Sequence, residues 1–237
     1  AESFLYLGDT ARVPYGSKSA ETVCRYASTC AAVLLRRGVK MLVVACNTAS
    51  AYALDHLREE LDVPVIGVVE PGVHSALRTS KSGRIGVIGT LGTIRSGAYQ
   101  RAIGAAAPNA LVFTKACPLF VPLADEGWTS GDVPRRVAES YLADFRDTGI
   151  DTLVLGCTHY PLLRDVIADV MGPNVQLVDS AEATAEAVSQ AIDGLGLESE
   201  SGDPTELILV SDNPENIATV GERFLNRPIE RVEWVDF

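Results

Sequence analysis

The sequence predicts an α/β fold with two pseudo-symmetric, doubly wound domains, each built on a mostly parallel sheet. Short apolar runs alternate with amphipathic segments along the chain, as is typical of βα units. An internal repeat supports the division: residues 38–48 and 149–159 each run from a glycine through an apolar strand to a cysteine and polar residues. The two glycines and the two cysteines are separated by the same number of positions, so the repeat contains no insertion. A (βα)₈ barrel is not excluded by strand count, but the repeat favours two domains.

The first half of the chain reads as successive strand–helix units. After an apolar strand over 3–7 and a loop, Ser19 predicts the start of a helix that runs to about Arg37, with Glu21 in its first turn. The first strand of the repeat ends at Cys46. The expected order from there is a strand over 41–45, a helix over 47–61, a strand over 64–69, a helix over 73–79, a strand over 84–89 and a helix over 90–103.

The second half continues the alternation after a strand over 111–115. Segment 117–123 is apolar, but Pro118 and Pro122 interrupt it, so we expect a shaped loop there. The remaining expectations are a helix over 132–146, a strand over 152–156, a helix from about 161, a strand over 175–178, a helix over 181–193, a linker over 194–204, a strand over 206–211, a helix over 214–224 and a strand over 229–233. We predict a first domain from residues 1–69 plus 180–237 and a second from 70–179.

The composition narrows the class of protein. The chain has 237 residues, 47% of them hydrophobic and 22% charged, which fits a globular protein with a substantial core. A net charge of −11 disfavours nucleic acid as a ligand. No apolar run approaches the roughly 18 residues that span a bilayer. Five cysteines without a CxxC pair favour a reducing cytoplasm, and three histidines without zinc-like spacing predict no structural metal.

The two cysteines of the repeat are the candidate reactive groups. Cys46 and Cys157 each end a strand where a helix is expected to begin, and ligands bind at the carboxyl ends of strands in open α/β sheets. The helix dipole and free backbone N–H groups should lower the pKa of a thiol there. Two such thiols predict one cleft between the domains.

Polar side chains follow each cysteine. Asn47 and Thr48 follow Cys46, whereas Thr158 and His159 follow Cys157. Their donors suit a small acidic substrate, and His159 could exchange a proton with it. The series Gly86-x-x-Gly89-x-x-Gly92 is a weak phosphate signal, and a tight turn explains it equally well.

Five segments together resemble the bacterial glutamate racemases of the cofactor-independent aspartate/glutamate racemase family: 8–16, 45–49, 87–90, 117–123 and 155–163. The resemblance covers essentially the whole chain. The combination of D-T-A-R-V-P-Y-G with C-T-H-Y-P-L is its most specific part. Aspartate and hydantoin racemases share the two cysteines but not all of the flanking motifs.

The resemblance implies cofactor-independent conversion of L-glutamate to D-glutamate for peptidoglycan precursor synthesis, and hence a role in cell-wall biogenesis and cell shape. Cys46 and Cys157 would be acid/base thiols on opposite faces of the substrate, with His159 assisting Cys157. The family's acidic position falls at about Asp125, with Glu126 as the neighbouring candidate. The substrate-binding residues implied are Pro14, Tyr15, Gly16, Asn47, Thr48, Thr90, Thr93 and Thr158. The resemblance implies no cofactor or metal, a cytoplasmic location and a homodimer.

The family pattern also includes an opening strand that ends in Asp-Ser-Gly, and nothing before Ala1 carries it. We therefore expect a strand and a helix to be missing from this sequence. The alternatives are an aspartate or related racemase, a cysteine hydrolase using Cys157 and His159, and an inactive binding or regulatory chain. Some glutamate racemases restrain DNA gyrase, but the acidic composition gives no support for that partner. A redox role for separate strand-end thiols is the weakest alternative.

Overall fold

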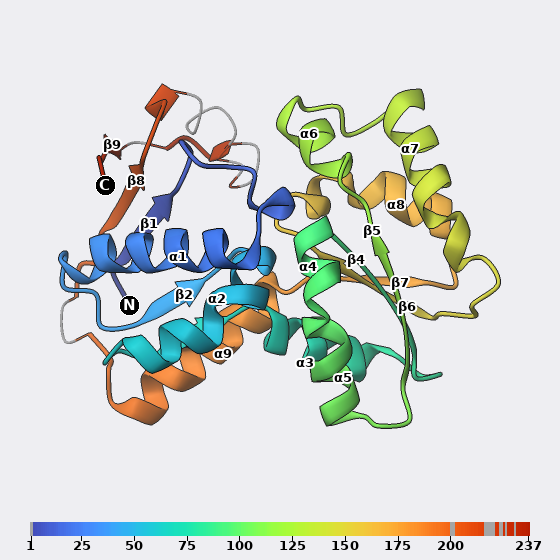
Figure 1. Cartoon of the computed structure of the whole chain (residues 1–237), viewed down its shortest axis with the longest axis horizontal. Coiled ribbons are helices and arrows are strands. Elements are labelled where there is room, and N and C mark those ends of the chain that lie inside the picture. The colour runs from blue at the N-terminus through green and yellow to red at the C-terminus, as the bar shows by residue number, and fades with distance from the viewer. Residues whose placement is uncertain (1, 200–201, 216–220, 223–224, 226, 230) are drawn as a thin grey trace.

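Parallel strands organise both halves of the molecule (Figure 1). The computed structural model describes residues 2–199, 202–215, 221–222, 225, 227–229 and 231–237. Every strand pair recorded among these residues is parallel. The α/β class and the mostly parallel sheets predicted from the sequence are therefore confirmed.

One half contains a four-stranded sheet in the order β5-β4-β6-β7. Its strands are β4 (Arg84–Gly89), β5 (Leu111–Ala116), β6 (Thr152–Gly156) and β7 (Gln176–Val178). Alternate residues of the central strands face opposite sides. Val87 and Val154 pack with α3 (Val69–Thr79) and α5 (Ala98–Ala106). Leu153 and Leu155 pack with α7 (Asp132–Leu142) and α8 (Arg164–Met171) on the other side. This two-residue alternation buries the sheet between two helical layers.

The other half contains two smaller sheets. One has the order β1-β8-β9, formed by Phe4–Gly8, Glu206–Val210 and Val232–Trp234. The second pairs β2 (Leu42–Val44) with β3 (Val65–Gly67). Apolar residues of α1 (Ala20–Leu35) and α2 (Asn47–Glu60) cover β2 and β3. Helix α9 (Ala181–Leu195) contacts both β3 and α3, so it lies where the two halves meet (Figure 1). The exact domain bounds stay a prediction.

Two predicted boundaries were wrong for the same reason. Segment 117–123 is not a loop, because helix α6 (Phe120–Asp125) begins inside it. Helix α3 begins at Val69 and shortens the strand predicted over 64–69. Pro122 and Pro71 are each the third residue of their helix. The first four N–H groups of a helix have no partner within it, so proline costs little at this position.

Other helices are interrupted where they were predicted to be continuous. Gly97 has a φ of 68°, which ends α4 (Leu91–Ser96) before α5 begins. The helix predicted over 132–146 ends as the 3₁₀ turn Ala143–Phe145, and the one predicted from 161 begins as the 3₁₀ turn Tyr160–Leu163. The helix predicted over 214–224 falls largely outside the described residues.

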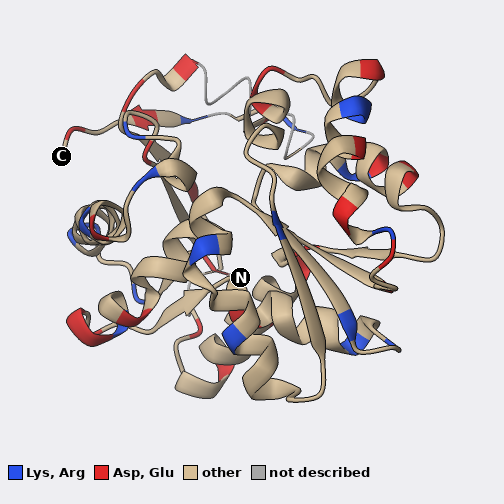
Figure 2. Cartoon of the chain, turned by 45° about the vertical axis from the view of Figure 1, so that its right-hand side comes forward, with Lys and Arg blue, Asp and Glu red and all other residues tan. Residues whose placement is uncertain are grey.

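Charged residues lie mainly on helices and connecting segments, whereas the strands are mostly uncharged (Figure 2). None of the described helices is long and apolar enough to cross a membrane.

Candidate active site

The two repeat cysteines lie at equivalent points of the two halves. Cys46 follows β2 and is the N-cap of α2, and Cys157 follows β6. The glycines that open the repeat, Gly38 and Gly149, both have positive φ, at 77° and 66°. Tyr99 links the two cysteine segments, because its hydroxyl bonds Asn47, next to Cys46, and its ring would lie 3.2 Å from a Cβ at Gly156, next to Cys157. Both thiols are free.

The predicted lowering of the cysteine pKa values is wrong in its net direction. Burial raises the pKa of Cys46, although N–H groups of Ala49 and Thr48 act in the opposite sense. Burial also raises the pKa of Cys157 to about 12, against the backbone N–H groups of His159 and Tyr160. The sequence pattern identified the helix-start donors correctly. Desolvation outweighs these donors, because the atoms packed around both thiols displace water from them.

Three buried threonines join the halves beside these thiols. The hydroxyl of Thr48 lies 2.8 Å from that of Thr90 and 3.1 Å from that of Thr93, which are themselves 3.1 Å apart. Thr48 is on α2, whereas Thr90 caps α4 and accepts a hydrogen bond from the Thr93 N–H. The cluster combines hydroxyl groups with a helix start, which suits a carboxylate ligand.

Asn47 is held by a residue that the sequence reasoning missed. The buried hydroxyl of Tyr99, on α5, donates to Asn47 Oδ1 over 2.7 Å. This contact fixes the amide so that its N–H₂ group is free of the tyrosine and directed elsewhere. Burial raises the pKa of Tyr99, so it stays a donor. Tyr99 occupies an ordinary apolar helix position, and only its distant partner reveals its role.

A line of polar contacts leads away from Cys157. His159 Nδ1 lies 3.8 Å from Cys157 Sγ and 3.3 Å from the Thr158 hydroxyl. His159 Nε2 lies 3.1 Å from Asp125 Oδ1. Asp125 is the last residue of α6, and Glu126 is its C-cap. Of the two acidic candidates, Asp125 is therefore the one in contact with the histidine.

The predicted Pro14–Tyr15–Gly16 segment also reaches the junction. Tyr15 to Ser17 form a 3₁₀ turn that contacts α4. A Cβ atom at Gly16 would lie only 2.5 Å from Thr90 Cβ, so the backbone of the turn packs directly on the threonine cluster. A Cβ at Gly92 would lie 3.2 Å from Gly16 O. Glycine at both positions permits this close approach.

The other glycines of the 86–92 series have packing roles. A Cβ at Gly86 would lie 2.7 Å from an Ile150 side-chain atom and 2.8 Å from one of Leu153. At Gly89 it would lie 3.2 Å from Gly156 O. These contacts favour the turn-and-packing interpretation over a phosphate loop. No group of three or more metal-ligating side chains occurs within the described part of the chain.

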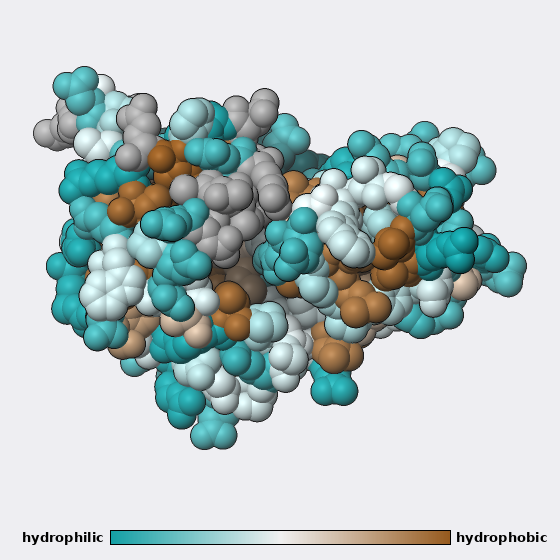
Figure 3. Space-filling model, turned by 90° about the horizontal axis from the view of Figure 1, so that it is seen from above, coloured by the Kyte–Doolittle hydropathy of each residue, from teal (hydrophilic) through white to brown (hydrophobic). Residues whose placement is uncertain are grey.

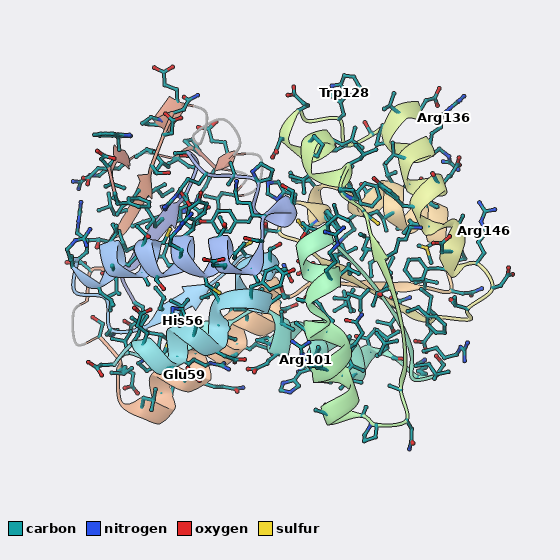
Figure 4. The ribbon with its side chains drawn as sticks, viewed as in Figure 1. His56, Glu59, Arg101, Trp128, Arg136 and Arg146 are labelled. Atoms are coloured by element: carbon teal, nitrogen blue, oxygen red, sulfur yellow. The ribbon has the colours of Figure 1, made fainter. Side chains whose placement is uncertain are left out.

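Seen from above, the surface is hollowed between the two halves, with apolar residues near the hollow (Figure 3). The contacts across the junction place Asn47 and Thr48 against Tyr99, Thr90 and Thr93. In contrast, Trp128 and Arg146 lie at the periphery (Figure 4). The structure thus brings the predicted polar residues to the junction, while their contacts with substrate stay predictions.

Fold and site together define a two-part α/β enzyme with paired thiols where its halves meet. A sequence model of the Asp/Glu/Hydantoin racemase family matches residues 2–188. The chain belongs to this family.

Individual relatives agree with that assignment. A glutamate racemase from Geobacter metallireducens is 54% identical over 94% of this chain and 83% of its own length. The crystal structure of a glutamate racemase isoform from Bacillus anthracis is similar with a TM-score of 0.95 and 36% identity, covering 100% of this chain and 88% of that one. A Francisella tularensis glutamate racemase in complex with D-glutamate gives a TM-score of 0.93 at 36% identity, covering 99% and 88%.

Proposed function

We propose that this protein interconverts L- and D-glutamate by a two-base mechanism in which Cys46 and Cys157 act on opposite faces of the substrate. The observation that carries the proposal is the pair of free thiols at matching positions of the repeat, each at the end of a strand, with Tyr99 between their segments. Each follows a strand and precedes helical backbone. A single nucleophilic cysteine would not require this pairing.

The proposed reaction is a balanced transfer of two protons. One cysteine, as thiolate, removes the proton from Cα and becomes a thiol. The second cysteine delivers its thiol proton to the opposite face and becomes a thiolate. The thiols have then exchanged protonation states, and proton exchange with solvent restores the starting form. His159, 3.8 Å from Cys157 Sγ, is placed to assist that exchange.

Raised thiol pKa values fit this chemistry. An α-proton of glutamate is a very weak acid, and a desolvated thiolate is a stronger base than one in water. With the pKa of Cys157 at about 12, the unliganded site holds a thiol rather than a thiolate. We therefore infer that substrate binding accompanies thiolate formation.

Glutamate fits the donors that surround the thiols. The hydroxyl cluster of Thr48, Thr90 and Thr93 offers hydrogen bonds to a carboxylate, and the amide of Asn47 and the hydroxyl of Thr158 extend that set. The glutamate-racemase names of the relatives and the D-glutamate complex of the Francisella protein support glutamate over aspartate.

We extend the proposal to the product. D-glutamate would enter peptidoglycan precursor synthesis, and the protein would thereby contribute to cell-wall biogenesis and cell shape. We propose a cytoplasmic homodimer that needs no organic cofactor. Support comes from the bacterial glutamate racemases among its relatives and from five free cysteines, which fit a reducing compartment.

The test is incubation of the purified chain with L-glutamate in D₂O without pyridoxal phosphate. Circular dichroism would follow loss of optical activity, and NMR would follow deuterium at Cα. A two-base enzyme places solvent deuterium in the first D-glutamate formed, while the remaining L-glutamate stays protiated. Absence of both racemisation and exchange with either enantiomer would contradict the proposal.

Single substitutions test the thiols. Cys46→Ser and Cys157→Ser should each lower kcat by about 10³-fold, since each removes an acid/base group. Cys24→Ser is the matched control, because that thiol lies within α1 and donates to Tyr52 O rather than ending a strand of the repeat. Full turnover in either Cys46→Ser or Cys157→Ser would overturn the two-base scheme.

A cysteine hydrolase is the second candidate, because Cys157, His159 and Asp125 form a line of contacts typical of an activated nucleophile. It gives no role to Cys46. A hydrolase would retain activity in Cys46→Ser and show a covalent acyl-enzyme by mass spectrometry. The two-base proposal predicts neither result.

A further inference from the structure

A buried carboxylate outside the thiol pair lies just after β1. The side chain of Asp9 is only 7% exposed, yet it belongs to none of the groups proposed to move protons or hold substrate. Both of its oxygens lie 2.8 Å from Arg12 Nε. Ser211 Oγ donates to Asp9 Oδ1 over 3.1 Å and accepts from the Ala11 N–H. Asp9 is therefore fixed from several directions.

Arg12 is itself held by aromatic side chains. Its guanidinium carbon lies 4.4 Å from the centroid of the Tyr26 ring and 4.7 Å from that of Phe237. Such cation–π contacts restrain a guanidinium while leaving its N–H groups available. Arg12 thus neutralises the Asp9 charge and limits its movement.

The remaining contact of Asp9 leads to the site. Tyr15 donates its hydroxyl hydrogen to Asp9 Oδ2. Burial, followed by this hydrogen bond, raises the pKa of Tyr15, so the phenol stays protonated and continues to donate. The next residue is Gly16, whose backbone packs against Thr90. The Tyr15 side chain therefore links the Asp9 carboxylate to the turn that packs on the threonine cluster.

We propose that Asp9 is a positioning residue: through Tyr15 it holds the Pro14–Tyr15–Gly16 turn against Thr90 and so keeps the substrate site closed. This inference rests on the proposed racemisation, because it assigns the turn a role in holding glutamate. When the hydrogen bond is lost, the closed turn becomes a smaller fraction of the population. The apparent affinity for glutamate falls in proportion to the fraction of molecules with a closed turn. In contrast, kcat is unchanged, because it is measured with the closed complex saturated.

Tyr15→Phe is the first test, because it removes the hydroxyl and keeps the ring that lies 5.9 Å from Tyr26. We expect the KM for glutamate to rise about tenfold, with kcat altered by less than twofold. Glutamate binding measured by titration calorimetry should weaken by the same factor. An unchanged KM and binding constant would overturn the proposal.

A double-mutant cycle tests the connection to Asp9. Asp9→Asn should raise KM by at least as much as Tyr15→Phe, and the double variant should match Asp9→Asn alone. Additive effects would show that the two residues act independently and would contradict the proposal. Should Asp9→Asn fail to fold, Tyr15→Phe alone still decides the outcome.

Thr10→Val is the matched control for general damage to this segment. The Thr10 side chain bonds the backbone of Asp212, and no hydrogen bond joins it to the Asp9 carboxylate in the described part of the chain. We expect lower thermal stability with an unchanged KM. A tenfold rise in KM here would mean that any loosening of the loop suffices, which overturns the specific role of Asp9. Failure of the proposed function is distinguishable, since the unmodified chain would then neither bind nor racemise glutamate.

Discussion

The two halves of the internal repeat place a cysteine at the same point of the backbone but in different surroundings. Strand β6 lies between β4 and β7, and all of its residues are buried. Strand β2 pairs with β3, and no second neighbour is recorded for it within the described ranges. Val43 is accordingly 37% exposed, whereas its counterpart Val154 is fully buried. Among the described residues, the same backbone pattern therefore places one thiol after a fully buried strand and the other after a partly exposed one.

The residues two positions after each cysteine differ more sharply. Thr48 joins the threonine cluster across the junction, whereas its counterpart His159 contacts both Cys157 and Asp125. One half thus supplies a hydroxyl beside its thiol, and the other supplies an imidazole. The repeat specifies where the thiols lie, whereas the side chains beside them differ between the two halves.

Among the substitutions that test this difference between the halves, replacing His159 should lower kcat/KM most. We expect His159→Asn to lower kcat/KM by about 100-fold, because Cys157 loses its proton-exchange partner. The loss must be equal in both directions, since the two enantiomers are equally stable. Steady-state kinetics from L- and D-glutamate would measure it. Thr48→Ser, which keeps the hydroxyl at the equivalent position, should change kcat/KM by less than twofold.

Asp125→Asn should have a smaller effect, about tenfold on kcat. Asp125 Oδ1 lies 3.1 Å from His159 Nε2 and would orient the imidazole, but the Asp125 side chain is 48% exposed and solvent screens part of the interaction. Glu126→Gln is the control, with kcat expected within twofold of the unmodified chain. A larger loss in Glu126→Gln than in Asp125→Asn would reverse the assignment of the acidic residue.

The strand ends should differ in their tolerance of a methyl group. A Cβ at Gly156 would lie 2.7 Å from Ile88 O, so Gly156→Ala should lower the free energy of unfolding by about 2 kcal/mol. Ala45 holds the equivalent position in the other half, where it is exposed. Ala45→Gly should be the milder change. Urea denaturation would compare them, and equal losses would contradict the difference in packing.

The raised thiol pKa also predicts a change in the pH dependence of stability. Burial raises the pKa of Cys157 from 9.0 to about 12, so the unfolded chain loses this proton first as pH rises. The stability that the protonated Cys157 thiol contributes is complete below pH 9 and is lost as the pH rises from 9 to 12. Cys157→Ser should therefore reduce the fall in the unfolding midpoint across that interval. Cys117, whose pKa burial also raises to about 12, would maintain part of the slope. An unchanged slope would contradict the buried-thiol assignment.

Local pattern was sufficient for most of the fold. The alternation of apolar and amphipathic segments predicted the strands of both halves and the parallel class. Its errors were at helix boundaries: α3 begins earlier than predicted and α6 begins within a predicted loop, with Pro71 and Pro122 in their first turns, and Gly97 interrupts a helix predicted to be continuous. Proline blocks a helix interior but is compatible with the first turn, and a single sequence does not show which environment applies.

The sequence by itself determined that two thiols end two equivalent strands, because a repeat in residue types records a repeat in backbone geometry. Tertiary structure alone decided what surrounds them. The hydrogen bond from Tyr99 to Asn47 joins residues 52 positions apart, and the threonine cluster joins two halves of the molecule. Tertiary structure also decided the direction of the thiol pKa values. Desolvation depends on everything packed around a group, whereas helix-start donors can be read from a few neighbouring residues.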